Sequence, residues 1–133
     1  MRVAVITSSS WIVVATIDDR GRCAVRDELD LIVLDDRDAH AQIIAVLGRV
    51  AVTGPPKDER RSRHLDDGIF ELKTPRRSRL IYFFGPRRTM VCTDICKKPG
   101  PTELRRLIRR ARDFRETYLA ASAGGDIVIE IGG

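Results

Sequence analysis

The sequence lacks the features that several large functional classes require. No apolar run reaches the roughly 18–20 residues of a membrane-spanning helix. The apolar stretch at residues 1–6 is interrupted by residues 7–10 and is too short for the core of a signal peptide, so we expect a cytoplasmic protein with no membrane partner. There is no EF-hand, Walker or GxSxG pattern. The sequence therefore offers no motif for a membrane protein, a P-loop nucleotide-binding protein or a serine hydrolase.

Cysteine and histidine are also scarce. The three cysteines, Cys23, Cys92 and Cys96, include no CxxC pair, and with two histidines they do not give the spacing of a zinc site. If Cys92 and Cys96 share a strand, their Cα atoms lie roughly 13 Å apart on one face, which is too far for a disulfide. We therefore expect buried free thiols, no metal and no cofactor.

Basic residues are unevenly distributed along the 133 residues. The whole chain carries 24 Lys+Arg and 19 Asp+Glu, a net charge of +5. Residues 57–115 hold 18 basic and 8 acidic side chains, whereas residues 1–56 hold 6 and 8, and residues 116–133 hold none and 3. Such clustering is typical of proteins that bind nucleic acid or another polyanion, although a solvated basic surface would give the same composition.

Length and composition predict one soluble domain over residues 1–133, since 43% of residues are apolar and 32% are charged. In the first half, Trp11–Ile17 is typical of a strand. Residues 26–34 fit a helix or a strand. A helix capped by Asp36 or Asp38 follows and stops at Gly54-Pro55-Pro56, and Lys57–Arg63 is predicted to be a charged connector.

Apolar residues in the second half predict a meander of three antiparallel strands followed by a helix and a final short strand. The predicted strands are Gly68–Lys73, Arg79–Phe84, Thr89–Ile95 and Asp126–Ile131, and the helix runs from Glu103 to about Leu119 with Thr102 as its cap. We expect the Trp11 strand to pair with the meander after the helices cross over. The fold class is α+β, with helices on one face of a small, mostly antiparallel sheet. The apolar segment RVAVI at residues 2–6 and the strand DIVIEI at residues 126–131 go beyond the minimal fold, and we expect that they can pair with each other and extend the sheet.

An ordered set of short motifs then resembles the RelE/ParE toxin superfamily, and within it the HigB-like, phage-derived branch. The stretches that carry the resemblance are LDDGIFELK at residues 65–73, RLIYFF at 79–84, DICKKP at 94–99 and ARDFRETYL at 111–119. Their order and spacing match the family over residues 65–119, and residues 120–133 form a short C-terminal extension. The resemblance implies a fold like that of microbial ribonucleases and the toxin of a type II toxin–antitoxin system.

The resemblance further implies metal-independent, ribosome-dependent cleavage of mRNA. Its partners would be mRNA, the ribosome and a cognate antitoxin, a small helix-turn-helix protein. Cleavage needs a base for the 2′-oxygen, a cation for the phosphorane and an acid for the leaving 5′-oxygen. The residues that match the family and could supply these groups are Arg79, Lys73, Glu71 and Lys97. We expect Arg79 to bind the scissile phosphate through two parallel hydrogen bonds.

Further cations are expected to bind RNA. They are Arg76, Arg77, Arg87, Arg88, Lys98, Arg105 and Arg109. His64 is an alternative proton carrier near neutral pH, and Asp94 lies where several family members keep a catalytic residue. We assign Trp11, Phe70 and Tyr82 to packing rather than to base stacking.

Two other functions remain open. Some members of the superfamily poison DNA gyrase, so this chain could be a non-enzymatic binding protein acting on gyrase, the ribosome or another partner. It could also be a generic basic RNA-binding domain.

Overall fold

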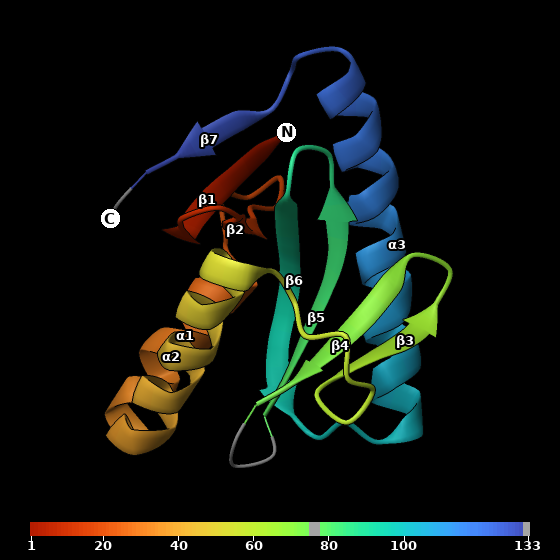
Figure 1. The fold of residues 1–133 in the computed structure, drawn as a ribbon. Helices are drawn as coiled ribbons and strands as arrows, with labels where there is room; N and C mark the ends of the chain where they lie inside the picture. The colour runs from red at the N-terminus through yellow and green to blue at the C-terminus, as the bar shows by residue number, and fades with distance from the viewer. Residues whose placement is uncertain (75–77, 132–133) are drawn as a thin grey trace.

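The computed structural model describes residues 1–74 and 78–131 as a seven-stranded sheet with three helices (Figure 1). The elements in chain order are β1 (Arg2–Ser8), β2 (Ile12–Thr16), α1 (Ala24–Asp35), α2 (Arg37–Thr53), β3 (Ser62–Asp66), β4 (Ile69–Lys73), β5 (Ser78–Gly85), β6 (Thr89–Lys97), α3 (Pro101–Ala123) and β7 (Val128–Glu130). None of the described helices is both long enough and apolar enough to cross a membrane.

The strand order is β3-β4-β5-β6-β2-β1-β7. The pairs from β3 to β6 and the pair of β1 with β2 are antiparallel, whereas β2 pairs with β6, and β1 with β7, in parallel. The α+β class, the mostly antiparallel sheet and the pairing of the Trp11 strand with the meander are therefore confirmed. The extra terminal strands do pair with each other, through the register Val3↔Ile129.

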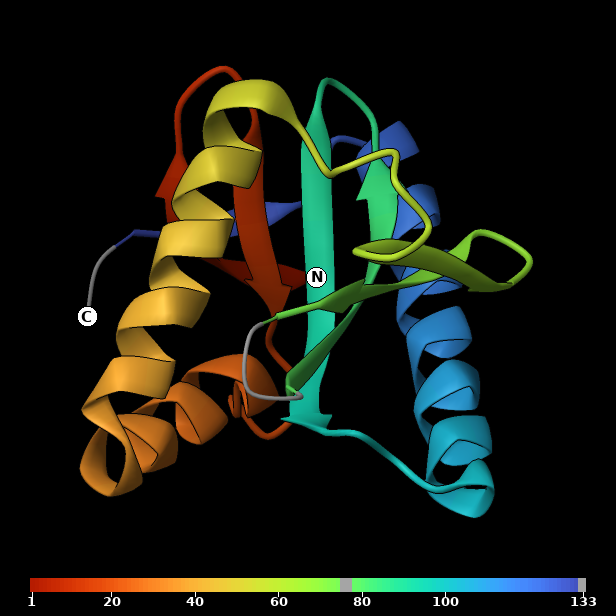
Figure 2. The same cartoon turned by 60° about the horizontal axis from the view of Figure 1, so that its bottom comes forward.

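Helices cover both faces of the sheet, so the prediction of helices on one face is wrong. One core lies between α1, α2 and the sheet and includes Leu47, Leu80 and Tyr82. A second lies between α3 and the other face and includes Phe83 and Leu107. Figure 2 shows the sheet between α2 and α3. The cause is visible in β5, whose buried residues 80–83 are apolar at every position, as strands covered on both sides require.

The first two helices begin and end where local chemistry requires. The ambiguous residues 26–34 belong to α1. Asp36 is the N-cap of α2, and its Oδ1 accepts a hydrogen bond from the Ala39 backbone N–H at 3.0 Å. The helix ends at Gly54, which has φ +84°, a conformation that favours glycine, and whose N–H donates to the Val50 carbonyl.

Two boundaries differ from the sequence prediction. The last two residues of the connector predicted over Lys57–Arg63 belong to β3. This edge strand is polar and partly exposed, and it lacks the alternation of apolar residues from which strands are predicted. The last helix starts at Pro101 with Gly100 as its N-cap, so Thr102 is not the cap. Proline suits the first helical turn because its missing N–H would have no partner there. The helix also continues to Ala123 through the residues predicted to be a linker.

A β-bulge in β6 changes which residues share a face. Ile81 pairs with Asp94 and Tyr82 with Cys92, so Thr93 is the extra residue. Cys92 consequently belongs to the core under α1 and α2, whereas Cys96 packs on the α3 face, and the expectation that they share a face is wrong. All three cysteines are free thiols. Burial raises the pKa of each thiol, that of Cys96 to about 11, so they remain protonated at neutral pH.

Candidate functional site

Three neighbouring strands bring charged side chains together on the α3 face of the sheet. Arg63 on β3 lies directly across from Glu71 on β4, and Lys73 on β4 lies across from Arg79 on β5. Because residues two apart in a strand share a face, Glu71 and Lys73 point the same way. The sheet therefore brings together Glu71, Lys73 and Arg79, three of the residues that match the family.

Glu71 is the centre of this cluster. Its side chain is almost fully buried. Its Oε1 forms ion pairs with two arginines, at 3.4 Å from Arg79 Nε and at 3.5 Å from Arg63 Nη2. The Arg79 side chain is itself 12% exposed, and its Nη1 donates to the Ser78 carbonyl at 3.2 Å. A buried carboxylate needs such partners because an unpaired buried charge is strongly unfavourable. Glu71 therefore holds the Arg79 guanidinium in a fixed position.

A small hollow of about 110 Å³ opens at the cluster. Its lining residues are Arg63, Glu71, Lys73, Arg79, Lys98, Pro99 and Leu104. Four of them are cations and one is an acid, so the hollow carries excess positive charge. A guanidinium offers five N–H donors in a planar fork, more than the two described contacts of Arg79 use. The arrangement can bind a phosphate group and stabilise negative charge that develops on it.

The structure separates the two lysines of the KKP motif. Lys98 lines the hollow with Arg79. Lys97, which is predicted from the family motif to be catalytic, lines a different hollow beside α1 and the start of α2, with Ser78 and Asp36. The two predicted RNA-binding residues Arg76 and Arg77 lie outside the described residues.

The remaining predicted RNA-binding residues lie on other parts of the surface. Arg87 and Arg88 are exposed in the turn after β5, at the opposite end of that strand from Arg79, on the order of 20 Å away. Arg105 is exposed in the first turns of α3 and donates to Thr102 Oγ1. Arg109 lines a hollow between α3 and the ends of β1 and β2. The structure therefore does not gather these four residues around the cluster.

Part of the positive charge of α3 is neutralised by carboxylates. The pairs are Arg106 with Glu103, Arg110 with Asp94, and Arg112 with Asp66. Arg115 packs its guanidinium beneath Gly68, which has φ +70° and no room for a Cβ. The helix is thus less electropositive than its sequence suggests, and several of its arginines attach it to the sheet and to the β3–β4 turn.

Asp94 is one of these attachment points and does not line the hollow. The bulge at Thr93 turns it to the α3 face, where its Oδ2 accepts from Arg110 Nε at 3.1 Å. Burial raises the pKa of the Asp94 carboxyl, and the attraction of Arg110 only partly opposes this shift. Asp94 therefore anchors α3, although it lies where several members of the family keep a catalytic residue.

The raised pKa of Asp94 predicts a pH-dependent gain in stability for Asp94→Asn. A raised folded-state pKa contributes stability below the unfolded value, near pH 4, and this contribution is lost as pH rises through the folded pKa. Asparagine does not ionise and keeps an oxygen acceptor for Arg110. The free energy of unfolding of Asp94→Asn should therefore rise relative to wild type between pH 3 and 7, measured by urea unfolding.

Glu103→Gln provides a control of opposite sign. The hydrogen bond from Arg106 lowers the pKa of the Glu103 carboxyl. Its contribution is present above the unfolded pKa and is lost as pH falls, so Glu103→Gln should lose stability relative to wild type as pH rises. A difference between Asp94→Asn and wild type that stays constant with pH would contradict the role given to Asp94.

One member of the cluster was missed by sequence reasoning, and one alternative lies elsewhere. Arg63 was assigned to a connector because β3 has no apolar alternation, and only its pairing with β4 reveals its place. His64, the next residue, lies on the opposite face, where its ring packs edge-on against Phe70. Among the described residues, no three His, Cys, Asp or Glu side chains lie close enough to hold a metal ion.

Comparison with known families gives one match. A family model described as "Phage derived protein Gp49-like (DUF891)" matches residues 30–116. The matched segment begins in α1 and ends in α3, so it contains Arg63, Glu71, Lys73, Arg79 and Lys98. No curated protein matches the chain.

Proposed function

Because the chain belongs to the family of phage-derived Gp49-like proteins, we propose that it is the toxin of a type II toxin–antitoxin system. Its activity in this proposal is metal-independent cleavage of mRNA on the ribosome, which inhibits translation. The resemblance of residues 65–119 to the HigB-like branch of the RelE/ParE superfamily supports the proposal, and most of that stretch lies in the segment that the family model matches. The whole chain, residues 1–133, then acts as a single toxin domain.

The observation that carries this proposal is the buried pair of Glu71 and Arg79 at the edge of a cationic hollow. A surface arginine that only adds solubility needs no buried carboxylate to fix it. Here, a guanidinium is held in place by a carboxylate that is 2% exposed, and further cations surround it. Fixed positive charge of this kind stabilises a transition state better than mobile charge, because it need not reorganise during the reaction.

Each charged residue of the hollow has a role in the proposed reaction. Arg79, assisted by Arg63, binds the scissile phosphate and stabilises the phosphorane formed when the 2′-oxygen attacks. As the 2′-hydroxyl attacks phosphorus it loses its proton to a solvent water molecule, and Lys73 donates a proton to the 5′-oxygen as the bond from phosphorus to that oxygen breaks. Glu71 acts as a positioning residue for Arg79. Lys98, rather than Lys97, is the lysine of the KKP motif that contacts the RNA backbone.

The proposal names two further kinds of partner. A small helix-turn-helix antitoxin neutralises the protein, and the ribosome presents the mRNA. A reading frame of that kind next to this gene would support the antitoxin.

A translation assay tests the proposed activity. The purified protein is added to ribosomes translating a defined mRNA, and the 5′ ends of the RNA fragments are mapped. New ends within the translated region are expected, and they should require both the ribosome and Arg79. Unchanged mRNA ends, together with normal growth after induction in cells, would overturn the proposal.

A second candidate is binding without cleavage on the same fold. Among the described residues, neither histidine nor tyrosine lines the hollow, and histidine is the commonest proton carrier near neutral pH. This candidate would be favoured if a variant with Arg79 replaced still inhibited growth and no cleavage of mRNA was detected. A gyrase assay and a ribosome-binding assay would then identify the target.

A further inference from the structure

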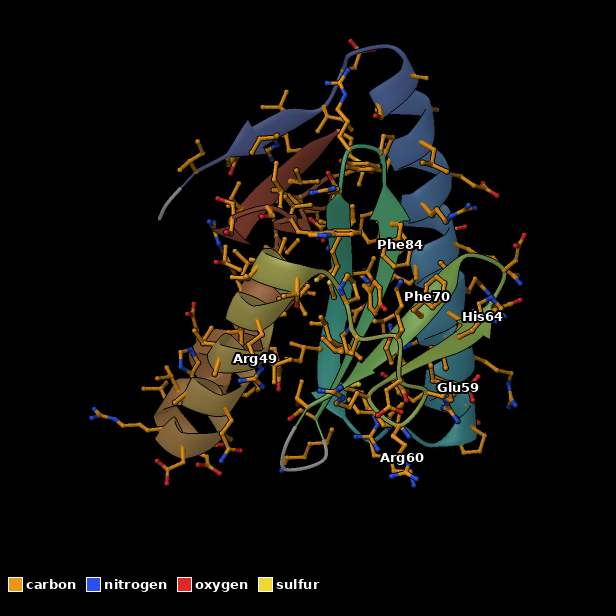
Figure 3. The ribbon with its side chains drawn as sticks, in the orientation of Figure 1. Arg49, Glu59, Arg60, His64, Phe70 and Phe84 are labelled. Carbon is orange, nitrogen blue, oxygen red and sulfur yellow. The ribbon has the colours of Figure 1, made fainter. Side chains whose placement is uncertain are left out.

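The face of the sheet opposite the hollow carries a row of aromatic rings. We call Trp11, Phe84, Phe70 and His64 the aromatic row. Consecutive ring centroids lie 5.9, 5.2 and 5.2 Å apart, each pair in an edge-to-face arrangement. Figure 3 shows the labelled rings of Phe84, Phe70 and His64 following one another from β5 to β3. Tyr82 is buried beneath the row, stacked on Phe70, and its hydroxyl hydrogen-bonds to that of Ser62.

No described helix covers this part of the sheet, and the rings are not fully buried. Phe84 is 39% exposed, His64 is exposed, and Trp11 and Phe70 are half-buried. The connector between α2 and β3 crosses in front of these strands (Figure 1). Together with the rings, its residues 54–57 and 59 line a hollow of about 410 Å³. Rings that a sequence pattern assigns to packing therefore also have surfaces open to a ligand.

A second hollow continues from the first and is basic. It has a volume of about 600 Å³ and shares residues 53–57 with the hollow at the aromatic row. Its cationic lining residues are Arg49, Lys57, Arg61 and Lys73, of which Lys73, at the end of β4, also lines the Glu71 hollow on the other face. Among the described residues, no acid lines it. The charges that oppose them are Asp58, which pairs with Arg61, and Glu59, which lines the aromatic part. We call the two hollows together the connector groove.

The turn after Phe84 carries two further cations in a strained backbone, although neither of them lines the two hollows. Arg87 and Arg88 have φ of +61° and +54°. They belong to the three-residue loop between the paired residues Gly85 and Thr89, and non-glycine residues are disfavoured at positive φ. The turn therefore keeps two arginines in a backbone conformation that glycine adopts more readily.

We propose that the connector groove binds single-stranded RNA on the face opposite the proposed cleavage site. Bases stack on aromatic side chains, and the phosphates between them attract cations, so a nucleic acid strand complements both parts of the groove. An apolar protein segment would complement the rings only. The connector groove binds the RNA strand without cutting it. This binding role is additional to the proposed nuclease activity.

Trp11 makes the proposal directly testable because it is the only tryptophan in the chain. The full-length protein is titrated with a fluorescein-labelled 2′-O-methyl oligoadenylate of twelve nucleotides, which resists cleavage by 2′-oxygen attack. Binding in the groove should raise the anisotropy of the label and also quench Trp11 emission. An abasic oligonucleotide of the same length should bind more weakly and quench less, since it has no bases to stack.

Two variants test the two parts of the groove. Phe84→Leu keeps an apolar side chain but removes a ring, and it should weaken binding about tenfold. Arg49→Gln combined with Lys57→Gln should lower the slope of log affinity against log salt concentration by about 1.4, the value for two phosphate contacts to a single strand. Arg20→Gln combined with Arg22→Gln removes the same charge from exposed sites outside the groove and should lower the slope less.

Two outcomes would overturn the proposal. In the first, binding raises the anisotropy without quenching Trp11 emission, and Phe84→Leu does not change the affinity. This result would show that RNA binds at another surface, such as the Glu71 hollow. In the second, the oligonucleotide does not bind. This result would also overturn the proposal, and a protein partner would then be the alternative ligand of the groove. Both outcomes are independent of mRNA cleavage, so failure here is distinguishable from failure of the proposed function.

Discussion

Arg79→Lys is expected to lower the rate of mRNA cleavage about a hundredfold while the protein remains folded. Lysine keeps the positive charge beside Glu71, so the buried carboxylate retains a partner. It cannot, however, donate two parallel hydrogen bonds to a phosphate. The loss should appear in the rate at saturating ribosomes more than in binding. Quantitative mapping of RNA ends over time gives the rate, and circular dichroism verifies the fold.

Arg63→Lys is the matched control. Arg63 also pairs with Glu71, but its side chain is 51% exposed, against 12% for Arg79. An exposed ion pair contributes little, so cleavage should fall less than tenfold. Equal losses in the two lysine variants would contradict the special role given to Arg79.

Replacing Arg79 with alanine is a poorer test, because it should also destabilise the fold. The change leaves the Glu71 carboxylate buried with only the exposed Arg63 as a described ion-pair partner, which we expect to cost about 2 kcal/mol. Adding Glu71→Gln removes the buried charge and should restore part of that stability without restoring cleavage. Chemical denaturation of the single and double variants checks both expectations.

Gly54→Ala is expected to lower the free energy of unfolding by about 3 kcal/mol. Gly54 combines φ +84° with ψ 171°, a region that is essentially restricted to glycine. A Cβ there would also lie 2.9 Å from two atoms of the Trp11 indole. The indole also packs edge-on against Phe84, and this contact would be disturbed if the indole moved away from Gly54. Thermal unfolding should show a fall of roughly 10 °C.

Gly48→Ala, in the same helix, should have the opposite effect. Gly48 lies inside α2, and an added Cβ would meet no atom within 4 Å. Alanine in a helix interior is more stable than glycine by about 0.5–1 kcal/mol. If the two variants changed stability equally, the destabilisation at Gly54 could not be assigned to its backbone and to Trp11.

Sequence patterns predicted the parts of this fold that depend on neighbours close in the chain. Apolar alternation identified the central strands, and Asp36 and Gly54 marked the ends of α2. Patterns failed where pairing with a distant segment decides the outcome. β3 forms only because its backbone bonds to β4, and Cys96 changes face because Thr93 is an extra residue opposite β5.

The same distinction applies to the candidate site. Glu71 and Lys73 share a face by alternation, and the family motif drew attention to Arg79. Arg63 enters the cluster through a strand that carries no pattern. The choice between Lys97 and Lys98 depends on where β6 ends and the chain turns toward α3, which neither motif nor alternation specifies.

The central place of β6 also has a consequence for synthesis of the chain. This strand joins β1 and β2 to the β3–β5 group, and Pro99 and Leu104, which close the Glu71 hollow, follow it in the sequence. A ribosome that has made the first 90 residues therefore carries two parts of a sheet that cannot yet be joined. If the protein cuts mRNA as proposed, the nascent chain cannot do so until the ribosome has made the segment that includes Pro99 and Leu104.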